Sequence, residues 1–586
     1  MAPMSHSTWR VVRTVAVASL AGFCFGYDTG SVGALTTMDS FYAEFGHISE
    51  TLRGVIVAII LLPSAMSGVF AGNISDRLSR KRAIALGGYI FCTGQAISCV
   101  TFKHLGILAM GRIIAGLGEG VFLGTLNTYV AEISPKHLRG RMMLMTQTFI
   151  CIGVTAGFFV CYGSAKILHP SSLAWRLPFA ISSFVALVMS ILAPFLPYSP
   201  RWLLLHNRRA EAEAVLEKLV GTGPAAEIEK RELLAVSDQQ MAAKTTGGSK
   251  RAAFKQIWAP DVRWRTSLGA AVNAFQMLTG VDLILFYAPL LFTQAGLDPD
   301  SASFIASGVT GIVLIVSTFI TATFIDRVGR RPIYIGGGML VSITLFVIGS
   351  MYASGAAKTE AGKWTVIVFI FLFVFTFGTT MASATRLYSS EIQPSRTRAA
   401  ASSFSQATNQ ITNFAVAVSG PVFLEKSDYG PYMCYGALTA FGMVLAFFFM
   451  IETKGHSLEA IDDLFSSTSI PLAVPLPDFL VSRSSPLANA RLAVTSKVKE
   501  HRQRRESRAN SQSLGVGVDG IDGIRLRRPS RHGSSALAKA EGGGVDDKEV
   551  IHEEGEGSLS DPRIAFRREM AAAHSLGKND SAIDEE

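Results

Sequence analysis

The sequence predicts an all-α membrane protein, with twelve transmembrane helices in two six-helix halves and a disordered C-terminal tail. Apolar stretches of about twenty residues recur along the chain, each long enough to cross a hydrocarbon core of about 30 Å. Charged residues make up only 17% of the chain, whereas soluble proteins carry about 25%. Charged motifs of the first half also return at matching places in the second half.

The remaining composition excludes several classes of protein. The net charge of +9 does not indicate nucleic-acid binding, because the basic residues fall in short loops and in the tail. The six cysteines lack the spacing of a disulfide framework or a metal site. No nucleophile–base set or phosphate-binding loop is recognisable. We therefore expect neither an enzyme nor a bound cofactor or metal.

Twelve apolar spans follow from the hydropathy pattern. Six precede residue 200, at 14–36, 52–71, 83–102, 106–130, 143–163 and 174–196. Six follow residue 265, at 267–293, 303–325, 332–353, 364–389, 398–424 and 431–451. The first span continues through Gly26-Tyr27-Asp28 without a convincing cleavage site, so it is interpreted as a helix rather than a signal peptide.

A polar stretch, Arg201 to Arg265, separates the two sets of spans. Its segments Ala210–Val220 and Ala226–Met241 have the composition of short helices on the membrane surface. We divide the chain into an N-terminal half (1–200), a cytoplasmic linker (201–265), a C-terminal half (266–455) and a cytoplasmic tail (456–586). The tail is rich in Ser, Arg, Gly and Glu and lacks apolar periodicity, which predicts disorder.

Lys and Arg gather in alternate loops, which predicts the orientation of the chain. The basic loops follow spans two, four, eight and ten, and the opposite loops carry single lysines. Because basic loops face the cytoplasm, both termini and the linker are predicted to be cytoplasmic.

The two halves also repeat each other in the basic loops. Asp76-Arg77-x-x-Arg80-Lys81 returns as Asp326-Arg327-x-x-Arg330-Arg331, and Glu132-x6-Arg139 returns as Glu391-x6-Arg398. Two matches in register indicate duplicated halves. Such halves, with a site between them, are the physical basis of alternating-access transport.

Two charges lie inside predicted spans, where an unpaired charge is costly and usually functional. Asp28 is in the first span and Arg112 is early in the fourth. Together they can neutralise each other and can bind a proton in one conformation and release it in another, because the guanidinium stabilises the carboxylate only while they touch. Glu119 lies seven residues after Arg112 on the same helical face. It can compete for Arg112 or act as a second protonation site, and the sequence does not separate these alternatives.

The motifs, taken in order, resemble the sugar porters of the major facilitator superfamily. They are GYDTG (26–30), GNISDRLSRKR (72–82), GRIIAGLGEG (111–120), EISPKHLRGR (132–141), SPRWLL (199–204), QMLTGVD (276–282), DRVGRRP (326–332), EIQPSRTR (391–398) and ETKG (452–455). The resemblance runs from Gly22 to about Leu464 and is nearest to fungal monosaccharide/proton symporters. It implies the major facilitator fold, a location in the plasma membrane, and a sugar and a proton as transported partners.

The resemblance implies a cytoplasmic gate of charged side chains that tie helix ends together when the cavity faces outward and separate when it opens inward. By position, the gate comprises Asp76, Arg77, Arg80, Glu132, Arg139, Asp326, Arg327, Arg330, Glu391, Arg398 and Glu452. The sequence departs from the family at Ser79, where Gly is usual, and at Tyr198, where Glu is usual. We expect the bridge made by that Glu to be missing or to involve the phenol.

For proton coupling, the resemblance implies contact between Asp28 and Arg112, because the proton-coupled members carry an Asp at this position and the passive members a neutral residue. For the sugar, it implies hydrogen bonds from the amides Gln147, Gln276, Asn409 and Asn413.

Several positions of the implied sugar site depart from the family. Met277 and Leu314 replace amides, Gln410 replaces an aromatic residue, Asp282 replaces an Asn and Arg386 replaces a stacking Trp. Asp282 and Arg386 can pair with each other, or Arg386 can hold a substrate carboxylate. The first alternative suits a neutral hexose and the second suits a sugar acid or a quinate-like solute; family frequency slightly favours the neutral sugar.

The tail suggests further partners and a rival function. A basic run at 497–505 can contact anionic lipid of the bilayer, and Arg527-Arg528-Pro529-Ser530 has the pattern of a kinase site. A sugar receptor that signals through its tail without transporting is the alternative to a carrier.

Overall fold

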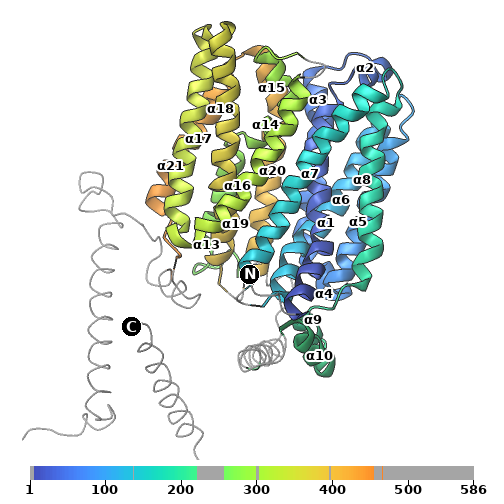
Figure 1. Cartoon of the computed structure of the whole chain (residues 1–586). Coiled ribbons are helices and arrows are strands. Elements are labelled where there is room, and N and C mark those ends of the chain that lie inside the picture. The colour runs from blue at the N-terminus through green and yellow to red at the C-terminus, as the bar shows by residue number, and fades with distance from the viewer. Residues whose placement is uncertain are drawn as a thin grey trace, which may run out of the picture. The chain divides into compact units, whose positions relative to one another are not determined.

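The computed structural model describes residues 6–135, 138–220, 227, 256–298, 302–394, 397–454 and 465. The described residues form twelve helical passages, each a single helix or a helix broken into two or three segments. Six passages precede the linker and six follow it (Figure 1). The predicted all-α fold with two six-helix halves is therefore confirmed.

The first half contains the six passages predicted. They are α1 (His6–Leu35), α3 (Glu50–Ala58) with α4 (Leu61–Leu78), α5 (Arg80–Cys99), α6 (Leu105–Ile133), α7 (Arg139–Ile167) and α8 (Leu173–Leu192), and the short α2 (Asp39–Phe45) joins α1 to α3. The prediction placed the start of the first span at residue 14, because hydropathy detects only the part of a helix that suits hydrocarbon. The break between α3 and α4 falls just before Pro63, whose ring displaces the carbonyl four residues earlier.

The second half repeats this arrangement with two more broken passages. Its passages are α13 (Arg263–Met277) with α14 (Val281–Phe286) and α15 (Ala288–Gln294), α16 (Ala302–Val328), α17 (Arg330–Ala353), α18 (Glu360–Thr379) with α19 (Met381–Glu391), α20 (Arg398–Lys426) and α21 (Gly430–Phe449). The breaks at 278–280 and at Thr380 flank the polar residues of α14 and α19. Each break therefore sets the position of side chains described below.

Ten of the described helical segments are both long and apolar enough to span a membrane. The passages outside this group are α5 and α20. On α20, the polar residues include Gln406, Asn409, Gln410 and Asn413, which lie on one face of the helix because their spacing is three, four and seven residues. A helix this polar is stable in a bilayer only when that face is turned towards other protein segments.

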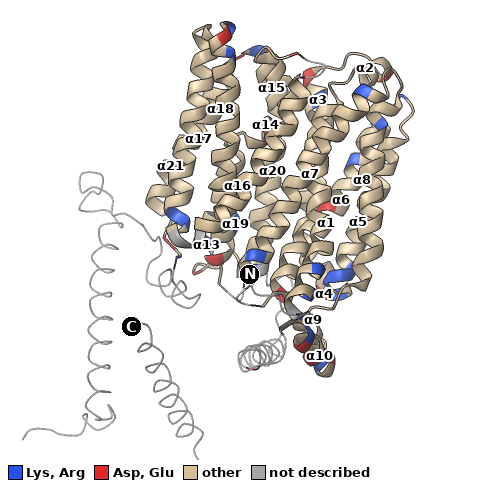
Figure 2. Ribbon diagram, in the orientation of Figure 1, with Lys and Arg blue, Asp and Glu red and all other residues tan. Residues whose placement is uncertain are grey.

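The helix bundle has two ends, the linker end and the far end. The linker end is the one where α4 turns into α5 and where α9 (Pro200–Leu205) and α10 (Arg209–Val220) lie, and the far end is where α1 finishes (Figure 1). Figure 2 shows Lys and Arg residues at the linker end and also at the far end. The predicted helix Ala210–Val220 is confirmed as α10, whereas Ala226–Met241, apart from Glu227, and the tail beyond Lys454, apart from Phe465, lie outside the described residues.

The two halves approach each other closely in their far-end parts. A Cβ atom at Gly33 of α1 would lie 1.5 Å from the carbonyl oxygen of Phe286 on α14, and one at Gly54 of α3 would lie 2.8 Å from that of Val418 on α20. Only glycine permits these backbones to meet, as is usual where helices associate in membranes. The two halves are thus in backbone contact at this depth.

The turns at the linker end repeat in backbone conformation as well as in sequence. Gly329, between α16 and α17, has φ 111° and ψ 161°, and Ser79, between α4 and α5, has φ 85° and ψ 154°. This region is essentially restricted to glycine, and another residue there is strained by about 1–3 kcal/mol. Ser79 is also buried, and its hydroxyl has no hydrogen-bond partner among the described residues. The departure of Ser79 from the family pattern is therefore a strained position.

We predict that Ser79→Gly stabilises the protein by ~1 kcal/mol, because glycine adopts this backbone conformation without strain. Thermal unfolding of the purified protein in detergent measures the effect. The matched control is Ser75→Gly within α4, which should lower the unfolding midpoint because glycine is a poor helix former. An unchanged or lower midpoint for Ser79→Gly would contradict the prediction.

Candidate functional site

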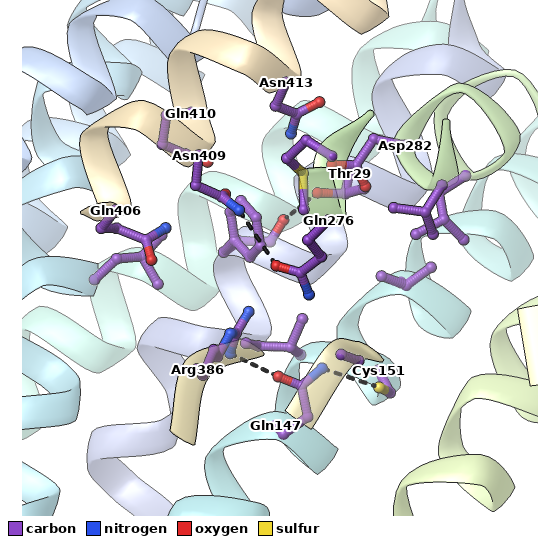
Figure 3. A pocket seen from close by; sticks show the side chains of 18 of the residues that line it. Thr29, Gln147, Cys151, Gln276, Asp282, Arg386, Gln406, Asn409, Gln410 and Asn413 are labelled. Carbon is purple, nitrogen blue, oxygen red and sulfur yellow. Dashed lines mark hydrogen bonds between the residues drawn. The ribbon is translucent and has the colours of Figure 1, made fainter. Parts of the chain in front are cut away.

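A polar pocket lies between the two halves, near the middle of the long helices. Residues from both halves line it, since α1, α6 and α7 contribute from the first half and α13, α14, α16, α18, α19 and α20 from the second. Amide side chains gather around it (Figure 3). A pocket at the interface of two duplicated halves is where rocking of the halves would expose it to each side in turn.

All six residues predicted for substrate binding line this pocket: Gln147, Gln276, Asp282, Arg386, Asn409 and Asn413. Asn409 donates to Gln276 Oε1 at 3.4 Å (Figure 3). Gln276 in turn donates to the carbonyl oxygen of Met381 at 3.3 Å. The buried Oδ1 of Asn413 has no hydrogen-bond partner among the described residues. A buried polar atom without a partner is costly, so this oxygen is available to a hydroxyl donor in the pocket.

Arg386 belongs to α19, and its side chain is exposed while it lines the pocket. One terminal nitrogen donates to Gln147 Oε1 at 2.6 Å, and Gln147 in turn donates to Cys151 Sγ at 3.8 Å (Figure 3). Among the ion pairs between described residues, none joins Arg386 to Asp282. The expectation that these two residues form a direct pair is therefore not met.

Asp282 lies at the start of α14. It is the second residue of α14, in the first turn, where free backbone N–H groups and the helix dipole favour a carboxylate. Its carboxylate also accepts a hydrogen bond from the side chain of Asn413. Arg386 lies beyond ion-pair distance of Asp282 but still interacts with it electrostatically, a distinction that the sequence alone did not reveal.

The pocket also contains polar residues that the sequence analysis did not assign to it, namely Thr29, Asn127, Thr146, Asn273 and Gln406. Gln410, noted there only as a departure from the family, lines it too. The signal for two of them was present. Gln406 lies three residues before Asn409, and Asn273 lies three residues before Gln276, so each shares a helical face with a predicted residue. Asn127, alone on an apolar helix, gave no such signal.

The charges predicted inside the first and fourth spans meet in the interior. Arg112 is fully buried and donates to Asp28 Oδ1 at 2.5 Å and to the carbonyl oxygen of Val57 at 2.9 Å. Gln95 of α5 donates to the same oxygen of Asp28 at 2.8 Å. The contact expected between Asp28 and Arg112 is present, and it is charge-assisted on both sides.

The gate residues of the first half lie close together at the linker end. Arg80 donates through two nitrogens to the two carboxylate oxygens of Glu132, at 2.9 and 3.1 Å. The same guanidinium lies 2.8 Å from Asp76. Ser199, the residue before α9, donates to Glu132 at 2.5 Å. The bidentate ion pair of Arg80 and Glu132 joins the start of α5 to the end of α6.

The second half places the equivalent residues in the same way. Arg330 lies 3.1 Å from Glu391, which also accepts a hydrogen bond from Thr453 at 2.6 Å. Glu452 accepts from the backbone N–H groups of Arg330 and Arg331 at 3.0 and 3.1 Å. Glu452 therefore caps the N-terminus of α17 through backbone N–H groups. The guanidinium of Arg330 contacts Glu391 instead.

The remaining gate residues differ in what the structure describes of them. Arg77 is exposed, and Arg398 donates to the carbonyl oxygen of Gln393 at 3.1 and 3.3 Å. The side chains of Arg139, Asp326 and Arg327 lie outside the described residues.

Tyr198 replaces the expected Glu by offering the face of its ring. The ammonium of Lys81 lies 3.8 Å from the ring centroid, and the guanidinium of Arg208 lies 5.4 Å from it. The ring also stacks on Trp202 at 5.4 Å. The ammonium of Lys81 is therefore held by a cation–π interaction and by hydrogen bonds to the carbonyl oxygens of Pro194 and Leu196. Arg208 also forms a hydrogen bond with the side chain of Tyr198, so the phenol takes part in the contacts at this position.

Comparison with known proteins agrees with this architecture. The family model described as "Sugar (and other) transporter" matches residues 14–465. The chain belongs to this family of membrane transporters. A quinate permease of Neurospora africana is 30% identical over 487 residues, covering 80% of this chain and 91% of that protein. A probable quinate permease of Aspergillus oryzae is also 30% identical, covering 80% and 90%.

Solved structures show the same fold. The proton:xylose symporter XylE, bound to 6-bromo-6-deoxy-D-glucose, is 24% identical with a TM-score of 0.67, covering 78% of this chain and 100% of that chain. The inward-open form of the E. coli xylose transporter XylE gives a TM-score of 0.63. The fold, the family and the named permeases together make this chain an integral membrane transporter of the major facilitator superfamily and not an enzyme.

Proposed function

We propose that the chain carries a monosaccharide-like solute across the membrane by alternating access, together with a proton. The observation that supports this most directly is the amide-lined pocket between two duplicated halves. Amides both donate and accept hydrogen bonds, so several of them can match the hydroxyls of a sugar ring in place of water. Rocking of the halves about the pocket would then move the solute without opening a continuous path.

The proton is assigned to the buried pair of Asp28 and Arg112. While the contact of 2.5 Å holds, the carboxylate is matched by the guanidinium. Separation of α1 from α6 during rocking would leave a bare carboxylate in a dry interior, and proton binding would remove that charge. Proton binding and conformational change are thereby linked.

A second candidate solute is a cyclic hydroxy acid such as quinate. It is favoured by Arg386, whose guanidinium is exposed in the pocket and not paired with Asp282. A planar guanidinium can hold a carboxylate with two hydrogen bonds, and the amides would hold the ring hydroxyls. Several relatives are named quinate permeases.

We further propose a plasma-membrane location with the linker and both termini in the cytoplasm, supported by the basic residues at the linker end (Figure 2). A tag inserted near Gly247, outside the described residues, should be labelled by antibody only after cells are permeabilised. Labelling of intact cells would reverse the orientation. Contacts of the tail with lipid or a kinase stay predictions. The rival function, a receptor that senses without transporting, would be excluded by net uptake of labelled solute into cells that lack their own carriers.

For the proton, we predict that Asp28→Asn abolishes uphill accumulation and keeps exchange of solute across the membrane. Asparagine retains the shape of the side chain but cannot bind a proton. Accumulation and exchange are measured in vesicles with and without an imposed pH gradient. The control is Asp39→Asn, at an exposed carboxylate on α2. Accumulation that still follows the pH gradient in Asp28→Asn would rule out this assignment.

For the solute, we predict that Arg386→Gln lowers uptake of the acidic substrate about a hundredfold, because a hydrogen bond to a charged group contributes roughly 1.5–3 kcal/mol. Uptake of neutral sugars should change little. The measurement is a panel of hexoses, pentoses, uronates and quinate at two pH values, with Lys166→Gln at the exposed end of α7 as the control. If the wild type takes up only neutral sugars, the hydroxy-acid candidate is excluded and the sugar candidate stands.

A further inference from the structure

Glu119 is a carboxyl group without a cation of its own in the centre of the bundle. It lies on α6, and only 1% of its surface is exposed. Arg112, two helical turns before it, uses its terminal nitrogens on Asp28 and on the carbonyl oxygen of Val57. The buried cluster of Asp28, Arg112 and Glu119 therefore contains two acids and one permanent cation.

Such a cluster is neutral only when one of the two acids carries a proton. The ionisable groups that interact with Glu119 among the described residues are Asp28 and Cys24 on α1 and Arg112 on α6. Cys92 of α5 faces Cys24, while α4 and α20 present Ser64 and Gln410, which do not titrate. Because Asp28 already accepts from Arg112 and Gln95, the proton belongs on Glu119 while that pair is intact.

Glu119 also touches the opposite half of the molecule and, through it, the pocket. The amide of Gln410 on α20 lies 3.2 Å from Ser64 Oγ and 3.5 Å from Glu119 Oε1. Gln410 itself lines the pocket (Figure 3), whereas Glu119 is not among the lining residues. One side chain thus separates the solute from this carboxyl, and rocking of the halves would break the contact.

We propose that Glu119 is a second proton-binding carboxyl of the transport cycle, protonated while Asp28 and Arg112 are paired, with Gln410 as its link to the solute pocket. The proton forms an O–H bond with Glu119 and leaves as a proton to water when the halves separate. As Asp28 gives up Arg112 and takes a proton, the guanidinium becomes available to the Glu119 carboxylate. This inference rests on the proton coupling proposed above and assigns a further group to it.

The test is exchange of labelled glucose or quinate, whichever the wild type carries, by protein reconstituted in vesicles over a range of pH. Wild-type exchange should slow at alkaline pH, as Glu119 loses its proton and the cluster becomes negatively charged. Glu119→Gln stays neutral at every pH, so the alkaline fall of its exchange should shift to the pH that is set by Asp28 alone. Thr125→Val, a buried change on the same helix away from the pocket, is the matched control and should behave as wild type.

The outcomes separate this inference from the function on which it rests. If wild-type uptake ignores a pH gradient, proton coupling itself is wrong. If the wild type is coupled and Glu119→Gln keeps the wild-type pH profile, only the role of Glu119 is wrong. Should Glu119→Gln not reach the membrane, Glu119→Asp retains a titrating group one methylene shorter and should shift the pH midpoint of exchange; an unshifted midpoint contradicts the proposal.

Discussion

The ion pair between Arg112 and Asp28 is the interaction on which the arrangement of the first half depends. A guanidinium that cannot lose its charge lies fully buried among apolar helices, and it is tolerated because a carboxylate, a backbone carbonyl and a neighbouring amide surround the pair. Helices α1, α3, α5 and α6 are therefore bound to one another at this point. Any movement of α1 against α6 would change the charge balance of the interior. The same ion pair that stabilises the first half can therefore link proton binding to conformational change.

The halves meet through a steric constraint at the far end, and around the pocket the constraint is polar. Glycines such as Gly33 bring the backbones of α1 and α14 into contact. In the middle, amides of α13 and α20 share their hydrogen bonds with each other and with backbone carbonyls. These bonds hold the second half together and can be exchanged for bonds to a solute. The same side chains thus serve helix association and recognition, because in a bilayer a polar group must always find a partner.

The linker end shows how duplication preserves an interaction while its details change. Arg80 with Glu132 and Arg330 with Glu391 occupy equivalent places. Around them the halves have diverged, since Ser79 is strained where Gly329 is not, and Tyr198 holds Lys81 through its ring. The paired charges themselves are present in both halves.

The sequence by itself determined the number of passages and the two halves, because hydropathy and in-register motifs report directly on burial in a bilayer. The resemblance supplied six polar positions of the pocket and missed others, among them Asn127 and Asn273. The motifs also placed Asp28 and Arg112 in contact. Tertiary structure alone decided that Asp282 stays apart from Arg386, that Gln410 reaches Glu119, and that Glu452 caps a helix. These outcomes depend on helix breaks and on rotations of one helix against another. Neither leaves a periodic trace in the sequence, since a shift of a few ångströms changes the partner of a side chain without changing its burial.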